Sequence, residues 1–403
     1  MAVKSGSLES LRELNRLRVV DALRRHGTLS RADIARITGL SRSTISTLVA
    51  DLHSRGFVIE RADPDEAPRA PALGRPPVLL RLDPSAGIAA GVDFDHTHVR
   101  VAVSDLSRTV VAEGAEDLDV DHDAQSSLDI AVDLVRRALA EAGVDEDRLL
   151  AVGVALAAPV DQVDGRVYDS TILADWTGID VAAELRERIG VPVHLDNDAN
   201  LGALAEVTLG AGQSARTAVY VQLSSGIGAG LIVDGRPFRG ATGTAGEIGH
   251  VTVDDGGELC RCGNRGCLET LASGPALLAR VQAIRGEAAT LQEVIALAED
   301  GDADVLAALE DVGRVVGRVL GQICNVLNPE MVVIGGDLSA AGELVVGPLR
   351  ETLMLVGLPP TTRRLEVVAG ELGDRANVLG ALSLAIAQSE QAVAARIAAA
   401  AAF

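Results

Sequence analysis

Two segments of the chain, about 130 residues apart, repeat the same order of elements, and this repetition limits the fold to two α/β lobes. The first segment contains three short apolar runs joined by turn residues, "GIAAGVDF", "HVRVAVSDL" and "TVVAEGAEDL". The second segment, "TAVYVQLSSGIGAGLIVDGRPFRG", again reads as strand, glycine turn, strand, turn, strand. Helices are expected near 126–142 and 302–326, each next to a further strand. Two lobes of this kind imply a cleft between them.

The first 82 residues differ from the rest of the chain in charge. They contain 14 Lys and Arg against 9 Asp and Glu, although the whole chain of 403 residues has a net charge of −21. The remaining residues therefore carry a balance of −26. A basic end on an acidic body predicts contact with nucleic acid at that end alone, because the body is repelled from phosphates.

A helix-turn-helix is predicted within residues 30–56. Ser30 can cap a first helix, with Asp33 in a capping-box relation, and Ser41 can cap a second. The apolar residues of the second helix follow i, i+3, i+4, i+7 spacing and are expected to face a core. They are Ile45, Leu48, Val49 and Leu52. The outward side, an arginine with small hydroxyl residues, suits insertion into a major groove. These candidate DNA-binding residues are Arg42, Ser43, Thr44, Ser46 and Thr47.

The segment "FVIERADPDEAPRAPALGRPPVLLRL" predicts a β-hairpin wing with a proline-rich loop. Its tip, 74–76, can place Arg75 in a minor groove of double-stranded operator DNA. The alternative is a surface helical bundle followed by a proline linker, with no contact to DNA. Capping, periodicity, charge and wing together favour a winged helix-turn-helix domain over residues 1–82.

Three of the four cysteines, Cys260, Cys262 and Cys267, lie within eight positions and suggest a metal site. His250 lies ten residues before the first of them and can supply a fourth ligand. Three thiolates and one imidazole form a closed tetrahedral zinc site, which is structural because no position is left for an activated water. The alternative is a set of reduced cysteines in a loop. Cys324 is expected to be a small core residue.

The composition favours a soluble, cytoplasmic protein that does not contact a membrane. The segment "MAVKSGSLESLRELNRLR" contains no apolar stretch of signal-peptide length. No later run reaches the roughly 18 uninterrupted apolar residues that a membrane span needs. Four cysteines are too few for the disulfide framework of a small secreted domain.

The region from about 86 to 388 resembles the ROK family (repressors, open reading frames and sugar kinases). The resemblance rests on five motifs: "GEIGH", "CRCGNRGCLE", "LDNDAN", "SSGIGAGLI" and "VVIGGDLS". It implies the two-lobed actin-like/hexokinase (RNase H-like) fold, in the α/β class. The front domain resembles that of the transcriptional-regulator branch of the family. We expect residues 83–210 to form lobe 1, completed by a C-terminal helix at 375–400, and residues 211–374 to form lobe 2 with the zinc site.

The resemblance also implies the residues of a sugar site. In related proteins the positions of Glu247, His250 and Glu269 bind sugar hydroxyls, and His250 with the three cysteines binds zinc. The position of Asn197 also contacts a sugar hydroxyl, and that of Asp198 is the general base of the kinases. Taken alone, an Asn-Asp-Ala-Asn turn is more often a helix cap.

The first phosphate loop departs from the family pattern. Where the kinases have Asp-x-Gly-Gly-Thr, this chain has Asp93 to Thr97 with Asp95 and His96 in place of both glycines. A carboxylate at that point repels a polyphosphate, and the side chains prevent close backbone approach. We therefore expect no kinase activity, and Asp198 is then a vestigial base. The sugar segment Asn-Leu-x-x-Trp also differs, because Ile172 and Leu173 replace its polar part.

Three functions remain open at this point. The favoured one is a sugar-responsive transcription factor, a repressor that binds an operator as a homodimer or homotetramer and a small carbohydrate or sugar phosphate in the cleft. The second is an ATP-dependent sugar kinase that carries a DNA-binding head. The third is a constitutive DNA-binding protein whose sensor domain has become purely structural.

Overall fold

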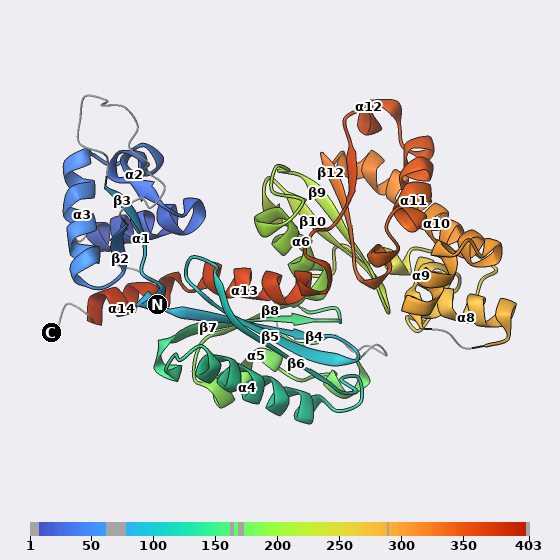
Figure 1. The fold of residues 1–403 in the computed structure, drawn as a ribbon, viewed down its shortest axis with the longest axis horizontal. Coiled ribbons are helices and arrows are strands. Elements are labelled where there is room, and N and C mark those ends of the chain that lie inside the picture. The colour runs from blue at the N-terminus through green and yellow to red at the C-terminus, as the bar shows by residue number, and fades with distance from the viewer. Residues whose placement is uncertain (1–7, 62–77, 162–164, 168–172, 288–289, 400–403) are drawn as a thin grey trace.

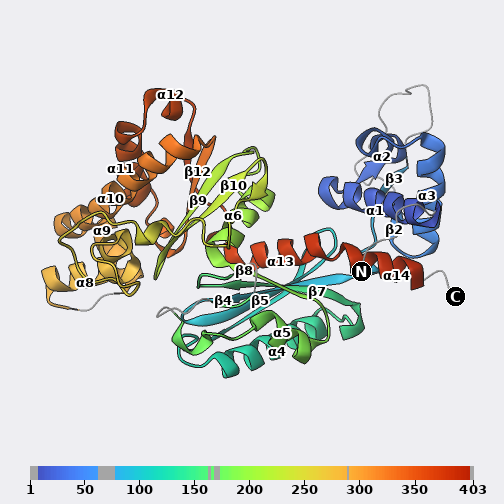
Figure 2. The same cartoon turned by 180° about the vertical axis from the view of Figure 1, so that it is seen from behind.

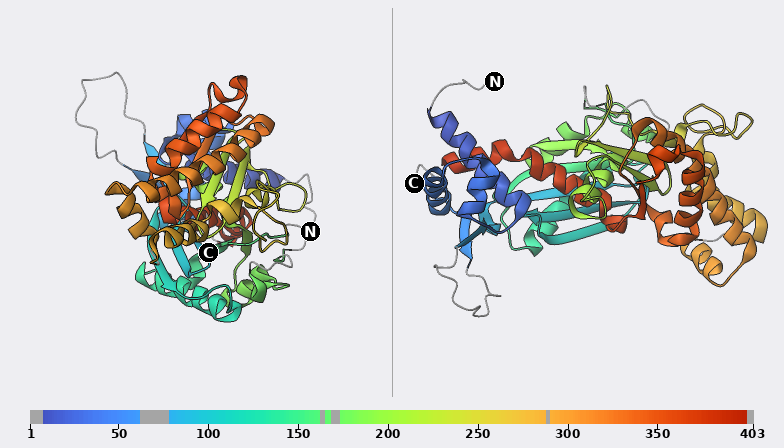
Figure 3. Two further views of the ribbon diagram at one scale, coloured as in Figure 1. Left: turned by 90° about the vertical axis from the view of Figure 1, so that its right-hand side faces the viewer. Right: turned by 90° about the horizontal axis from the view of Figure 1, so that it is seen from above.

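The computed structural model describes residues 8–61, 78–161, 165–167, 173–287 and 290–399. The molecule is elongated, with a small N-terminal domain (the head) at one end, one α/β lobe at the other end and a second α/β lobe below and between them (Figure 1). The view from above in Figure 3 shows the same order. Within the described residues, no helix is long and apolar enough to cross a membrane.

The head is a winged helix-turn-helix, as predicted. Ser30 accepts from the Asp33 N–H while Asp33 reaches back to the backbone of Ser30, and Ser41 accepts from the Thr44 N–H. Ile45, Leu48, Val49 and Leu52 are buried, also as predicted. Its elements are α1 (Leu8–His26), β1 (Leu29–Ser30), α2 (Arg31–Thr38), α3 (Arg42–Ser54), β2 (Val58–Arg61) and β3 (Leu79–Leu82). The three strands form one sheet in the order β1-β3-β2.

Lobe 1 is built on a mixed five-stranded sheet in the order β6-β5-β4-β7-β8. The strands are β4 (Ile88–Phe94), β5 (His98–Asp105), β6 (Val110–Asp117), β7 (Leu149–Leu156) and β8 (Val193–Asn197). The expected meander forms β4 to β6, and β7 and β8 extend it in parallel. Two helices, α4 (Ala124–Glu141) and α5 (Val181–Ile189), cover one face, and α13 (Ala376–Gln388) covers the other (Figure 2).

Lobe 2 repeats this plan with the sheet order β11-β10-β9-β12-β13. Its strands are β9 (Ala218–Leu223), β10 (Ile227–Val233), β11 (Arg236–Pro237), β12 (Met331–Gly335) and β13 (Glu366–Ala369). The helix α6 (Asp198–Leu209) packs on one face. The other helices are α7 (Leu268–Ala272), α8 (Gly274–Arg285), α9 (Leu291–Glu299), α10 (Ala303–Leu327), α11 (Glu343–Val356) and α12 (Pro359–Thr362). The two-lobed fold class is confirmed, whereas the proposed lobe boundaries stay a prediction.

The helices α6 and α13 lie between the two sheets and pack against each other (Figures 1 and 2). Three glycines allow backbone-to-backbone approach here. A Cβ on Gly153 of β7 would lie 1.8 Å from the Ala381 carbonyl oxygen, and one on Gly380 would lie 1.9 Å from that of Leu201. Gly91 of β4 meets the carbonyl of Val378 in the same way. The position of α13 is therefore fixed by close packing on both sides.

The C-terminal segment after α13 forms a second helix that contacts the head. The helix α14 (Glu390–Ala399) packs against the head, where Val393 and Ile397 join its apolar core. Arg55, at the end of α3, donates to the Ile397 carbonyl, and Arg24 of α1 donates to the Ile386 carbonyl. Burial of these two branched side chains stabilises the contact between α14 and the head.

Replacing Gly153 by Ala is expected to lower the melting temperature, because the new methyl group would push α13 away from β7. Overpacking of this kind costs about 1–3 kcal/mol. Gly347→Ala in α11 is the control, since its Cβ meets only the flexible end of Glu343 at 3.4 Å. Thermal unfolding followed by circular dichroism measures both, and equal melting temperatures would contradict the close packing of α13.

Candidate functional site

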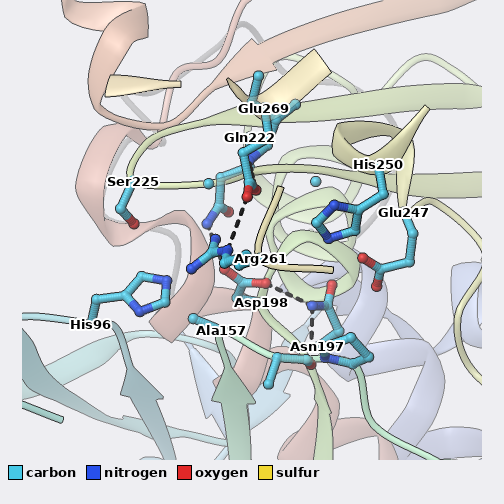
Figure 4. Close-up of a pocket in the computed structure, with 15 residues that line it drawn as sticks. His96, Ala157, Asn197, Asp198, Gln222, Ser225, Glu247, His250, Arg261 and Glu269 are labelled. Carbon is cyan, nitrogen blue, oxygen red and sulfur yellow. Dashed lines mark hydrogen bonds and ion pairs between the residues drawn. The ribbon is translucent and has the colours of Figure 1, made fainter. Parts of the chain in front are cut away.

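A pocket lies between the lobes, and all five predicted sugar-site residues line it (Figure 4). These residues are Asn197, Asp198, Glu247, His250 and Glu269. Lobe 1 contributes His96 and the turn 157–159 after β7. Lobe 2 contributes residues 225–228, which belong to the glycine-containing motif "SSGIGAGLI" at the turn from β9 to β10. The pocket therefore draws residues from both lobes, and lobe movement can change its shape.

Asp198 lies at the start of α6, where the strand β8 ends. Its Oδ1 accepts from the Ala199 N–H and from Asn197 Nδ2, both at 2.8 Å, and its Oδ2 accepts from Gln222 Nε2 at 2.6 Å. Burial raises the pKa of Asp198 to about 6, and the carboxylate of Asp95 adds to the rise. Asn197 also caps α6 through the Asn200 N–H, so it has the structural role expected of such a turn.

Glu247 is held against the first strand pair of lobe 2 by two glycines. Gly246 and Gly249 lie so close to β10 that a Cβ on either would meet the carbonyl oxygen of Ala229 or Ile227, at 1.9 and 2.2 Å. Burial raises the pKa of Glu247 to about 7, with further contributions from the carboxylates of Asp198 and Glu269. Figure 4 shows the carboxylate of Glu247 beside the ring of His250.

The four predicted metal ligands converge. One ligand atom from each of His250, Cys260, Cys262 and Cys267 lies within 4.8 Å of the other three. His250 Nδ1 is 3.6 Å from the Sγ of Cys260, and the Sγ atoms of Cys262 and Cys267 are also 3.6 Å apart. Gly266, with φ of +62°, allows the tight loop, because a Cβ there would lie 1.6 Å from the Asp254 carbonyl oxygen. This donor set can hold a metal ion.

The cluster also positions two pocket residues. The helix α7 begins directly after Cys267 and places Glu269, which accepts from the Ile227 N–H at 3.2 Å. Arg261 lies between two of the cysteines, and its Nε donates to Glu269 Oε1 at 2.9 Å. A metal ion in the cluster would therefore fix one wall of the pocket.

In the loop between β4 and β5, Asp95 forms hydrogen bonds within the loop through both its backbone and its side chain. The Asp95 N–H donates to the His98 carbonyl at 3.1 Å, and Asp95 Oδ1 accepts from the Thr97 N–H at 3.3 Å. Asp93 is buried, and burial together with the carboxylates of Asp95 and Asp198 raises its pKa well above the usual value. The loop therefore places the carboxylates of Asp93 and Asp95 near each other and near Asp198.

In the head, the outward side of α3 is open to a partner. Arg42, Ser43, Ser46 and Thr47 are exposed, and Thr44 is half-buried. The hydroxyls of Ser46 and Thr47 donate to carbonyls one turn earlier, at 3.0 and 3.1 Å. Arg75 lies outside the described residues.

A model of the ROK family matches residues 89–388, which is most of the chain. The chain belongs to the ROK family. A model of the MarR family matches residues 13–67, within the winged helix-turn-helix head. A head of this kind in front of a ROK domain is the domain composition of a ROK family transcriptional regulator.

Both transcriptional regulators and a sugar kinase are similar to this chain. The xylose repressor of Caldicellulosiruptor bescii is 28% identical over 394 residues, covering 94% of this chain and 97% of the repressor. The glucokinase of Thermotoga maritima is 35% identical over 247 residues, covering 58% of this chain and 78% of the glucokinase. The crystal structure of a ROK family transcriptional regulator, a homologue of the Escherichia coli Mlc protein, has a TM-score of 0.75 at 25% identity and covers 96% of this chain and 98% of its own. The regulators match the chain over nearly its whole length.

The sequence indicates no role for Gln222 and Arg261 of the pocket, and it places His96 in the altered phosphate loop without predicting that it lines the pocket. Gln222 lies in the buried and otherwise largely apolar strand β9. A polar residue in such a strand was the one sequence signal that could have indicated its role in the pocket. In the segment that departs from the family's sugar motif, the described residues at the fixed positions of the motif belong to the core. Leu173 and Trp176 are fully buried in the core of lobe 1, and Trp176 donates to the Val120 carbonyl at 2.7 Å. Ile172 lies outside the described residues.

Purified protein is expected to contain one metal ion per chain, measured by inductively coupled plasma mass spectrometry. Cys262→Ala should lose the ion, because a site of four ligands would keep only three, and Cys262 is the exposed member. Cys324→Ala is the matched control, since Cys324 is buried in α10 outside the cluster. Equal metal content in all three proteins would contradict the site.

Proposed function

We propose that the chain is a sugar-responsive transcriptional repressor. The observation that supports this most is the presence, on one chain, of a winged helix-turn-helix with an open α3 and an interlobe pocket of carboxylates, amides and imidazole. Such side chains accept and donate paired hydrogen bonds to sugar hydroxyls. The 28% identity to a xylose repressor over 94% of the chain agrees with it.

The head is proposed to bind double-stranded operator DNA as part of a homodimer or homotetramer, one half-site per subunit. Arg42, Ser43, Thr44, Ser46 and Thr47 would meet the major groove, and Arg75 at the wing tip would meet the minor groove. A sugar in the pocket would alter the closure of the lobes and, through the contact of α13 and α14 with the head, the affinity for DNA.

The metal ion is proposed to be a structural Zn²⁺, because three thiolates with one imidazole are soft ligands in a closed set. Held by His250, Cys260, Cys262 and Cys267, it would fix the segment that carries Glu247 and Glu269. Asn197, Asp198, Glu247, His250 and Glu269 are the proposed sugar contacts.

Loss of kinase activity is the second part of the proposal. The Thr97 N–H of this loop donates to Asp95 Oδ1. In a kinase, a backbone N–H of this loop would donate to a phosphate, whereas here it is used by a carboxylate of the same loop. Asp198 keeps the place of a general base, and its pKa of about 6 suits proton acceptance, but the nearby carboxylate of Asp95 disfavours a polyphosphate. The likeness to a glucokinase favours the alternative, an ATP-dependent sugar kinase with a DNA-binding head.

Arg42→Ala is expected to weaken operator binding about 5- to 150-fold, the equivalent of about 1–3 kcal/mol for one lost contact to a base or phosphate. Fluorescence anisotropy with DNA from upstream of the gene, at one fixed salt concentration, measures the change. Arg216→Ala is the control, because Arg216 is an exposed arginine of lobe 2 paired with Asp234. Unchanged affinity for Arg42→Ala would contradict the proposed role of α3.

With ATP and either D-glucose or D-xylose, the purified protein is expected to form no ADP above the blank. A coupled ADP assay measures this, with the Asp198→Asn variant run beside the parent. Turnover by the parent that disappears in Asp198→Asn would establish the kinase alternative, because that substitution removes the candidate base.

A further inference from the structure

A buried ion pair joins the two lobes next to the pocket. Asp196 lies in β8 of the lobe 1 sheet and its side chain is 1% exposed, whereas Arg239 follows β11 of the lobe 2 sheet. The Nε atom of Arg239 donates to Asp196 Oδ2 at 2.6 Å, and its Nη2 atom lies 2.6 Å from the same oxygen. Neither residue is among those that line the pocket, so this pair can act on the pocket only from outside it.

The carboxylate of Asp196 also holds the segment that lobe 1 contributes to the pocket. Its second oxygen, Oδ1, accepts from the Asn197 N–H at 2.9 Å and from Asn200 Nδ2 at 3.1 Å. Asn197 and Asp198, the two residues that follow Asp196, line the pocket, and α6 begins at the second of them. One carboxylate therefore binds Arg239 through one oxygen and the start of α6 through the other.

Arg239 has the corresponding role in lobe 2. Its carbonyl oxygen accepts from the Gly243 N–H at 3.1 Å and from the Ala245 N–H at 3.2 Å. These two hydrogen bonds close the turn 239–245, which leads to Glu247 of the pocket. The backbone of Arg239 therefore holds the loop before Glu247, while its side chain reaches the end of β8 in the other lobe.

The pair can form only over a narrow range of lobe arrangements. Charge-assisted hydrogen bonds of a guanidinium group need a short distance and a fixed direction, so a small separation of β8 from the turn 239–245 would break them. Asp196 would then keep a buried charge without the guanidinium group, which is strongly unfavourable. The intact pair therefore favours the arrangement in which the two pocket walls lie at their present separation.

We propose that Arg239 is a positioning residue of the pocket, and that its ion pair with Asp196 is a latch that holds the lobe 1 and lobe 2 walls together around a bound sugar. Ligand affinity then depends on two residues that do not line the pocket. This proposal rests on the proposed sugar-sensing function and adds to it a contact that favours closure of the lobes.

Isothermal titration calorimetry of the full-length, zinc-loaded protein with D-xylose and D-glucose tests the latch. Arg239→Gln and Asp196→Asn are each expected to weaken binding of the tighter of these two sugars at least about tenfold. The double variant should lose no more affinity than the more affected single variant, because both substitutions remove the same interaction. Unchanged affinity in the single variants, or losses that multiply in the double variant, would overturn the proposal.

Arg216→Gln is the matched control for these variants. It breaks the ion pair between Arg216 and Asp234, which has the same chemistry but is exposed within lobe 2, and it should bind sugar as the parent does. Melting temperature and zinc content identify any single variant that fails to fold. The double variant leaves no unpaired charge at the site and then provides the calorimetric test.

Hydrogen exchange in the sugar-free protein distinguishes a latch between the lobes from local support of one loop. In Arg239→Gln, amide exchange should be at least about threefold faster than in the parent, both in residues 240–247 and in the first turn of α6. The second segment follows β8 of lobe 1, although the substitution is in lobe 2. Faster exchange in residues 240–247 alone would show that Arg239 supports only its own loop, contrary to the proposal.

Operator binding separates failure of the latch from failure of the proposed function. In the parent, the bound sugar is expected to change the affinity for upstream DNA, and the sugar concentration that gives half of this change should be at least about tenfold higher in Arg239→Gln. Equal concentrations in both proteins would refute the latch and leave the proposed repressor function intact. If neither sugar binds the parent, the proposed function fails for these sugars, and hydrogen exchange decides whether Arg239 joins the lobes.

Discussion

Close packing of α13 on the sheet of lobe 1 and on α6 is the constraint on which the rest of the structure depends. Gly153 and Gly380 bring backbone to within a distance that no other residue permits, so α13 cannot shift without moving its neighbours. The same helix leads into α14, which completes the core of the head. Asp198 opens α6, so the pocket and the DNA-binding helices are joined through one continuous set of packed elements. Movement of the lobes about a ligand therefore has a physical route to the head.

One side of the pocket is formed by tightly packed loops, and carboxylate side chains line it from both sides. The cysteine cluster and the glycines beside β10 hold Glu247 and Glu269 in place, and α6 presents Asp198 from the opposite side. These carboxylates belong to the acidic part of the chain outside the head. In a kinase the same region must admit a polyphosphate, and here the loop at Asp95 satisfies its own amide instead. The acidic pocket and the altered loop therefore agree with the proposal of a sugar sensor that does not catalyse phosphoryl transfer.

Much of the fold could be predicted because its signals are local. The caps at Ser30 and Ser41, the buried face of α3 and the cysteine spacing depend on residues a few positions apart. The position of α14 and the pocket role of Gln222 depend on which distant surfaces meet, and spacing alone does not encode that. Trp176 shows the same limit, because the spacing of the residues around it does not indicate that its ring packs against Phe94 in the core.

The coupling between pocket and head is tested most directly by measuring operator affinity with and without a sugar that calorimetry shows to bind. Fluorescence anisotropy of the zinc-loaded protein on its upstream DNA, at fixed salt, provides that comparison. A repressor released by its effector should bind the operator at least about fivefold more weakly when the sugar saturates the pocket. An identical DNA affinity in both conditions would contradict sugar sensing and leave a constitutive DNA-binding protein whose ROK domain is purely structural.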